Sequence, residues 1–108
     1  MDTTISARHC EITEGLRDRA HAITGRLAQL SPHALEATVV FDTTPPLCTA
    51  EIRLHARGGK VLVGAGSATD HRTALDRAEE KLRPQLEKAA SRRRRARGPS
   101  TKSSTRPR

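Results

Sequence analysis

The segment that decides the fold is residues 48–66, which read CTAEIRLHARGGKVLVGAG. Its first half alternates strictly, with one face formed by Cys48, Ala50, Ile52, Leu54 and Ala56. Alternation with period two is typical of a strand that is covered on one side only. The Gly58-Gly59 pair predicts a two-residue hairpin turn. Residues 60–66 are then expected to return as a strand with Val61, Val63 and Ala65 pointing inward.

Two more strands are predicted upstream of this hairpin. Residues 4–8 alternate polar and apolar, and residues 36–42 place Ala37, Val39 and Phe41 on one face. The run 43–46, Thr-Thr-Pro-Pro, breaks the second of these strands.

Two amphipathic helices complete the pattern, and both have an apolar stripe with helical spacing. Thr13 is the expected N-cap of the first, whose stripe is Leu16, Ala20, Ile23, Leu27 and Leu30. Asp70 is the expected N-cap of the second, whose stripe is Leu75, Ala78, Leu82, Leu86 and Ala89. Pro84 falls inside the second helix and costs about 3 kcal/mol there, so we expect a kink or an early end near residue 83.

The order β-α-β-β-β-α in residues 1–90 predicts one α+β domain of two layers. A four-stranded sheet would carry both helices on one face. Its first two strands could be parallel neighbours, because a helix connects them, and the last three would form a meander.

The excess of basic residues that gives the net charge of +8 is confined to the end of the chain. Residues 1–90 hold 12 basic and 12 acidic residues, whereas residues 91–108 hold eight basic residues and no acid. We expect this segment to be a disordered Arg-rich tail. It would bind RNA by releasing counterions. A solvated tail that aids solubility, or weak attraction to a membrane surface, are the alternatives.

Basic residues also recur on both predicted helices. Arg17, Arg19 and Arg26 avoid the stripe of the first helix. On the second, Arg77, Lys81 and Lys88 share a face that leads into the arginines from residue 92. This pattern favours a phosphate track. The alternative is a solvated surface, in which these cations balance the neighbouring carboxylates.

Catalytic and metal-binding patterns are absent from the sequence. There is no Gly-rich phosphate loop and no nucleophile-elbow pattern. Cys10 and Cys48 stand far apart, and the five histidines are scattered. We therefore expect no enzyme activity, metal or cofactor. With Phe41 as the single aromatic residue, recognition through base stacking is disfavoured relative to backbone and shape recognition. The lack of a signal region or a membrane-spanning stretch predicts a cytoplasmic protein in a reducing compartment.

Two segments, residues 5–17 and residues 61–86, together resemble the ribosome hibernation promoting factor family, which includes ribosome-associated inhibitor A. The first reads ISARHCEITEGLR. The second contains a strand with small residues, then Asp70, Ala74-Leu75-Asp76, Lys81-Leu82 and Gln85-Leu86. The resemblance covers residues 4 to about 92 and includes the expected order of elements.

The resemblance implies a fold similar to a double-stranded-RNA-binding domain and a role without catalysis. Family members lie in the mRNA and tRNA channel of the small ribosomal subunit (30S), contact 16S rRNA through basic residues, and inhibit translation by occlusion. Arg8, Arg17, Arg26, Lys81, Lys88 and Arg92 match the family's basic positions. Together with the residues from the charge pattern, the expected RNA-binding set is Arg8, Arg17, Arg26, Arg77, Lys81, Arg83, Lys88, Arg92, Arg93, Arg94 and Arg95.

Some features depart from the family pattern. Arg72 stands where a tyrosine is common, and Pro84 replaces a frequent arginine, with Arg83 as a partial substitute. The dimerising second domain of long members is not expected, so the chain resembles the short members and would be a monomer off the ribosome. The alternative function is a general nucleic-acid-binding protein or RNA chaperone. A hydrolase acting on RNA or peptidyl-tRNA is a third, weaker class.

Overall fold

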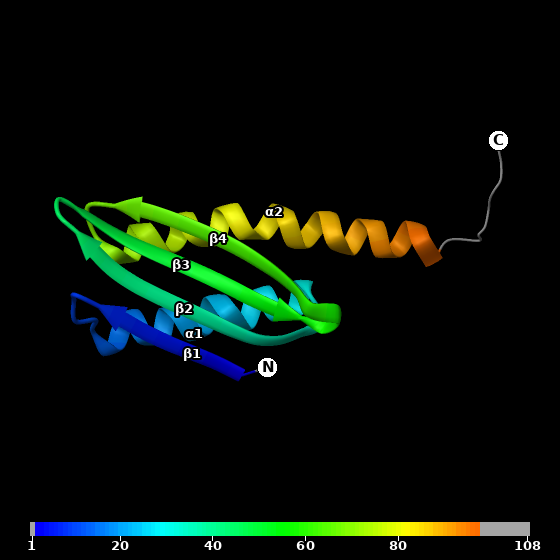
Figure 1. Ribbon diagram of the computed structural model, residues 1–108, viewed down its shortest axis with the longest axis horizontal. Coiled ribbons are helices and arrows are strands. Elements are labelled where there is room, and N and C mark those ends of the chain that lie inside the picture. The colour runs from blue at the N-terminus through cyan, green and yellow to red at the C-terminus, as the bar shows by residue number, and fades with distance from the viewer. Residues whose placement is uncertain (1, 98–108) are drawn as a thin grey trace.

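The computed structural model describes residues 2–97, and it describes the side chains of residues 2–89. The elements are β1 (Asp2–Arg8), α1 (Glu14–Leu30), β2 (Ala34–Thr44), β3 (Leu47–Ala56), a short 3-10 turn η1 (Arg57–Gly59), β4 (Lys60–Ala68) and α2 (His71–Arg97). The sheet order is β1-β2-β3-β4, with β1 parallel to β2 and the other pairs antiparallel. Both helices cover the same face of the sheet (Figure 1). The predicted α+β architecture is confirmed.

The core lies between the sheet and the two helices. The predicted stripes are buried there, with Ile23 and Leu27 from α1, and Leu75, Leu82 and Leu86 from α2. From the sheet, the buried residues include Val39, Phe41, Ile52 and Leu54, as the alternation of β2 and β3 predicts. Each large aliphatic side chain buried in this way contributes about 1.5–3 kcal/mol.

Both predicted N-caps are present. The Thr13 hydroxyl accepts a hydrogen bond from the backbone N–H of Leu16 at 3.0 Å. The Asp70 carboxylate accepts from the backbone N–H of Thr73 at 2.8 Å and from the Thr73 hydroxyl at 2.9 Å. Each cap satisfies a donor that the first helical turn leaves open.

The prediction that Val61, Val63 and Ala65 of β4 point into the core is wrong. Val61 and Val63 are 48% and 38% exposed, whereas Gly64 and Gly66 are buried. The connection is three residues long rather than two, because Ala56 pairs with Lys60. One extra residue in the turn moves every following side chain to the other face of the sheet.

Close packing of α2 on β4 explains why glycines occupy the inner face. A Cβ on Gly64 would contact the backbone carbonyl of Ala78 and lie 2.8 Å from the Cβ of Leu82. A Cβ on Gly66 would contact the carbonyl of Ala74 in the same way. A valine at either position would therefore push the helix off the strand.

The early end of the second helix at residue 83 is also wrong, since α2 runs on through Pro84 to Arg97. Leu82 and Leu86 are buried on either side of the proline, and their packing offsets its cost of about 3 kcal/mol. Pro84 and Glu80 are exposed, so the carbonyl that the proline leaves without a helical partner can be hydrated.

The helix also continues beyond residue 90. The backbone of residues 91–97 is helical, which differs from the disorder expected from residue 91. Extending an existing helix adds a hydrogen bond for each residue fixed, and arginine and alanine are good helix formers. The rest of the expected tail, residues 98–108, lies outside the described residues. The last turns of α2 project past the β3–β4 hairpin (Figure 1). In the described part of the chain, no helix is both long and apolar enough to span a bilayer.

Candidate RNA-binding surfaces

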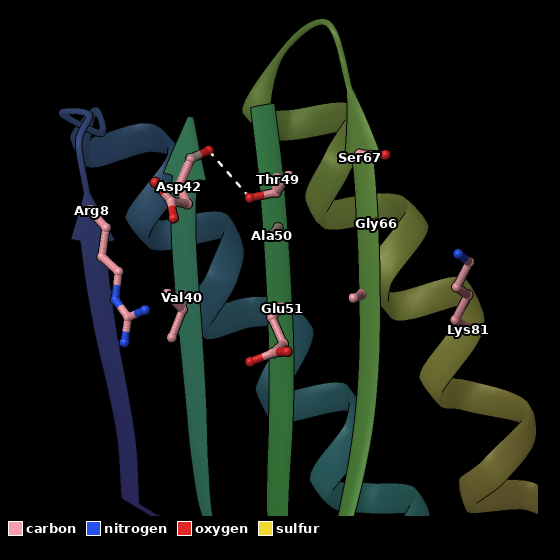
Figure 2. A pocket seen from close by; sticks show the side chains of 10 residues that line it. Arg8, Val40, Asp42, Thr49, Ala50, Glu51, Gly66, Ser67 and Lys81 are labelled. Atoms are coloured by element: carbon pink, nitrogen blue, oxygen red, sulfur yellow. Dashed lines mark hydrogen bonds between the residues drawn. The ribbon is translucent and has the colours of Figure 1, made fainter. Parts of the chain in front are cut away.

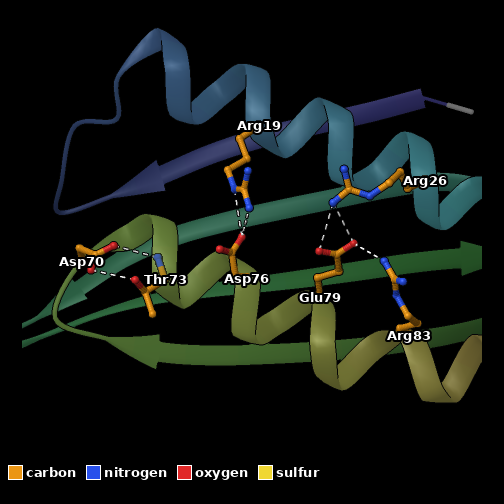
Figure 3. Close-up of polar contacts among 7 residues, drawn as sticks. All are labelled: Arg19, Arg26, Asp70, Thr73, Asp76, Glu79 and Arg83. Atoms are coloured by element: carbon orange, nitrogen blue, oxygen red, sulfur yellow. Dashed lines mark hydrogen bonds and ion pairs between the residues drawn. The ribbon is translucent and has the colours of Figure 1, made fainter.

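The two helices are joined by ion pairs along a line that we call the interhelical seam, formed by Arg19, Arg26, Asp76, Glu79 and Arg83 (Figure 3). Arg19 donates to Asp76 Oδ1 from Nε at 3.0 Å and from Nη2 at 2.8 Å. Arg26 Nη2 lies 3.2 Å from Glu79 Oε2, and Arg83 Nη2 lies 2.8 Å from the same oxygen. Two residues of the expected RNA-binding set thus converge on one carboxylate.

Burial makes Glu79 the anchor of this seam. Its side chain is 11% exposed, whereas Arg26 and Arg83 are 52% and 44% exposed. Both arginines use Nη2 for their contacts with Glu79, and a guanidinium carries five N–H donors. Glu79 can therefore hold two arginines side by side while other donors of each remain available to a phosphate.

The side of α2 next to β4 carries a second group of polar residues. Arg77 Nη1 donates to the Ser67 carbonyl at 2.6 Å, and Gln85 Nε2 donates to the Val63 carbonyl at 2.8 Å. Because β4 is an edge strand, these side chains cover backbone acceptors that another strand could use. Arg77 is therefore partly engaged with the sheet. Lys81 lies between the two and is exposed.

The open face of the sheet carries a shallow hollow of about 440 Å³. Arg8 on β1 and Lys81 on α2 flank it from opposite sides, with the Asp42 and Glu51 carboxylates between them (Figure 2). Two expected RNA-binding residues thus share a surface, but it is a surface of mixed charge.

Asp42 is held in its ionised form on this face. The hydrogen bond with His9 Nδ1, at 3.1 Å, is the largest cause that lowers its pKa, and the backbone N–H of Thr43, at 2.7 Å, is the next. Thr49 also donates to the backbone carbonyl of Asp42 at 3.4 Å (Figure 2). A phosphate approaching Arg8 therefore meets a fixed negative charge nearby.

The other expected residues are spread over the domain. Arg17 is exposed in the first turns of α1, and Lys88 is exposed near the β3–β4 hairpin. Arg92, Arg93, Arg94 and Arg95 lie in the helical part of α2, but their side chains are outside the described set.

Sequence analysis did not single out Arg57 and Lys60, which lie beside Lys88 around a third hollow. The sequence signal for them was their position on either side of Gly58-Gly59, which places both at the tip of a hairpin.

The described residues contain no group of three or more His, Cys, Asp or Glu side chains arranged to hold a metal ion. Cys10 and Cys48 are half-buried free thiols. The surfaces that the structure offers are thus built mainly from guanidinium and ammonium groups with carboxylate neighbours.

Comparisons with known proteins agree with this architecture. A solved ribosomal subunit interface protein from Coxiella burnetii superposes with a TM-score of 0.77 at 15% identity, covering 84% of this chain and 99% of the other. The N-terminal domain of Protein Y from Thermus thermophilus gives a TM-score of 0.73 at 27% identity, covering 82% of this chain and 99% of that one. No curated protein sequence matches the chain. The model of one family, described as sigma 54 modulation protein / S30EA ribosomal protein, matches residues 3–94, which cover α1, β2, β3 and β4 in full, all of β1 but Asp2, and nearly all of α2. The chain belongs to the sigma 54 modulation protein / S30EA ribosomal protein family.

Proposed function

We propose that this protein is a ribosome hibernation factor that binds the 30S subunit in the mRNA and tRNA channel and inhibits translation by occlusion, without catalysis. The observation that carries the proposal is the family match, which spans residues 3–94. The Thermus thermophilus relative, at 27% identity over 82% of this chain, supports the same assignment. The protein would act in the cytoplasm and would be a monomer when it is off the ribosome.

The distribution of cations supports binding within a channel. A protein that lies on one RNA duplex needs one basic face, because its phosphate contacts come from one side. Here Arg26 and Arg83 lie on the helical layer, Arg8 lies on the opposite open face of the sheet, and Lys88 lies at a third place. A domain with cations on several faces suits a channel that has rRNA on more than one side. Occupying that space excludes mRNA and tRNA, and no chemical step is needed.

Affinity would then depend strongly on salt, because cations that contact phosphates release counterions from the RNA. The arginines from residue 92 to residue 95 would add to this dependence. They lie at the end of α2 that projects past the sheet, where they can reach rRNA beyond the volume of the domain.

The test is sedimentation of the protein with purified small subunits at low and moderate salt, in the presence of a large excess of unrelated duplex RNA. We expect the protein to stay with the subunits despite the competitor and to dissociate at high salt. In parallel, prebound protein should prevent mRNA and initiator tRNA from assembling on the subunit. Loss of the protein to the competitor would instead favour a general nucleic-acid-binding protein or RNA chaperone.

A further inference from the structure

A hollow of about 1030 Å³ lies where the β3–β4 hairpin meets the α1–β2 loop and the later turns of α2. Arg57, Lys60 and Lys88 line it, and we call these three residues the hairpin corner. No Asp or Glu is among the lining residues. Among the described side chains, none forms an ion pair with any of the three cations. Positive charge is therefore concentrated here without an acidic neighbour in the wall.

Both helices run to this end of the sheet, but only α2 continues past the hairpin (Figure 1). α1 ends at Leu30, and the loop that follows it supplies Ser31 and His33 to the wall of the hollow. The rest of the wall is partly apolar and includes Val61, Leu62 and Ala89. Exposed and half-buried apolar side chains next to cations without a carboxylate partner form a surface that a ligand with both apolar and anionic parts would cover.

The backbone of the hairpin fixes where its two cationic residues leave the chain. Gly58 and Gly59 have φ values of 79° and 73°, a left-handed conformation that glycine adopts without strain. The resulting turn puts Arg57 and Lys60 on either side of a tight bend. The backbone N–H of Arg57 also donates to the carbonyl of His33 at 3.0 Å, which ties the hairpin to the α1–β2 loop.

We propose that the hairpin corner binds a nucleotide of RNA, with its phosphate on Arg57, Lys60 and Lys88 and its ribose or base against Val61 and Leu62. A nucleotide combines a charged group with weakly polar surfaces, as this hollow requires. The run of arginines beginning at Arg92, four residues after Lys88 in α2, continues the positive charge along the helix from the hollow. The inference rests on the proposed function and adds Arg57 and Lys60 to the RNA-binding residues.

The first test compares two charge-matched double variants of the full chain for binding to small subunits over a range of salt concentrations. Arg57→Gln/Lys60→Gln removes two cations of the corner. Arg53→Gln/Arg72→Gln removes two exposed cations elsewhere. Each lost phosphate contact lowers the magnitude of the log–log salt slope by about 0.7–0.9, and the corner holds one phosphate, so we expect the corner variant to lose at most about 0.9 units of slope and to bind roughly tenfold more weakly. The control variant should keep the wild-type slope.

A second pair of variants places a carboxylate instead of removing a cation. Ala89→Glu introduces a negative charge into the wall of the hollow, whereas Gln29→Glu introduces the same charge on the exposed side of α1. We expect roughly tenfold weaker binding for the first and at most about twofold for the second, because a carboxylate acts strongly only near the bound phosphate. Thermal melting of both variants checks that each is folded.

Crosslinking identifies the occupant. Small subunits whose RNA contains 4-thiouridine are irradiated with bound protein, and the RNA adducts are mapped on the protein. We expect adducts in residues 57–62 or 88–89. If wild-type protein binds the subunits but the two double variants bind alike, the corner proposal fails and the proposed function stands. RNA adducts elsewhere on the protein, with none in residues 57–62 or 88–89, would also overturn it. Failure of wild-type protein to bind subunits would overturn the proposed function itself.

Discussion

The interhelical seam and the hairpin corner both contain several cationic side chains, but they differ in whether a carboxylate lies beside them. In the seam, Arg26 and Arg83 share the nearly buried carboxylate of Glu79. In the corner, Arg57, Lys60 and Lys88 line a hollow whose wall contains no carboxylate. The same residue types thus have a carboxylate partner in one region and none in the wall of the other. A count of arginines and lysines does not separate these roles.

The largest expected effect comes from a change that disturbs both regions, because both depend on where α2 lies. Gly64→Val should destabilise the protein by about 3 kcal/mol or more, since its side chain would collide with α2 at Ala78 and Leu82. Urea unfolding measures this free energy. The control is Gly25→Ala, where a Cβ meets nothing within 4 Å, and a gain of about 0.5–1 kcal/mol is expected from helix propensity. Equal unfolding midpoints for the two variants would contradict the close packing of α2 on β4.

Neutralising two cations in each region should separate their roles in stability. Arg26→Gln/Arg83→Gln leaves the Glu79 carboxylate without its partners, and we expect a loss of about 1–3 kcal/mol. Arg57→Gln/Lys60→Gln should change the free energy of unfolding by less than about 0.5 kcal/mol, as is usual for exposed positions. Urea unfolding at one ionic strength gives both values. A corner variant as unstable as the seam variant would show that the corner cations have structural partners.

Binding of subunits by a Glu79 variant tests whether the seam also positions its arginines for RNA. Glu79→Gln adds one positive charge, so simple attraction to RNA predicts tighter binding. We expect about threefold weaker binding instead, because Arg26 and Arg83 lose the group that orders them before RNA is bound. Glu80→Gln, the exposed neighbour, makes the same change in charge and should bind equally or slightly more tightly. Tighter binding by both variants would show that Glu79 only offsets the charge of Arg26 and Arg83 and does not order them for RNA binding.

The smallest expected effect is the pH dependence at the start of α2, at the end of the helix far from the corner. The hydrogen bonds from the backbone and side chain of Thr73 hold the pKa of Asp70 below its ordinary value. A depressed carboxyl pKa gives stability that is full above the ordinary pKa and is lost as the pH falls through the folded-state pKa. Asp70→Asn should keep a helix cap and remove the part of the stability loss at low pH that comes from protonation of Asp70. The measurement is the melting temperature of both proteins from pH 6 down to pH 2.5.

The sequence predicted the order of elements because each signal was local. The alternation of β3, the helical stripes and the caps at Thr13 and Asp70 all depend on residues close together in the chain. The inward face of β4 was missed because it depends on the length of one turn. The continuation of α2 past Pro84 was missed because it depends on packing of Leu82 and Leu86 against the rest of the core.

The charged surfaces could be predicted only in part. The sequence indicates which residues are cationic, but it does not show that Arg26 and Glu79, which are 53 positions apart, lie in contact. Nor does it show that Lys60 and Lys88 meet across a hollow. Both arrangements arise because α2 packs beside α1 and beside the β3–β4 hairpin in the folded protein. Positions in a fold, rather than residue types, therefore decide which cations are available to RNA.

The cover over β4 also bears on self-association of the protein at high concentration. A β-branched edge strand with free carbonyls is a template on which another chain can add a strand and begin an aggregate. Arg77 and Gln85 occupy the Ser67 and Val63 carbonyls from α2, next to the exposed side chains of Val61 and Val63. The contact between Arg77 and the Ser67 carbonyl thus also protects the edge strand from pairing with another chain, and we expect replacement of Arg77 to increase aggregation before it affects folding.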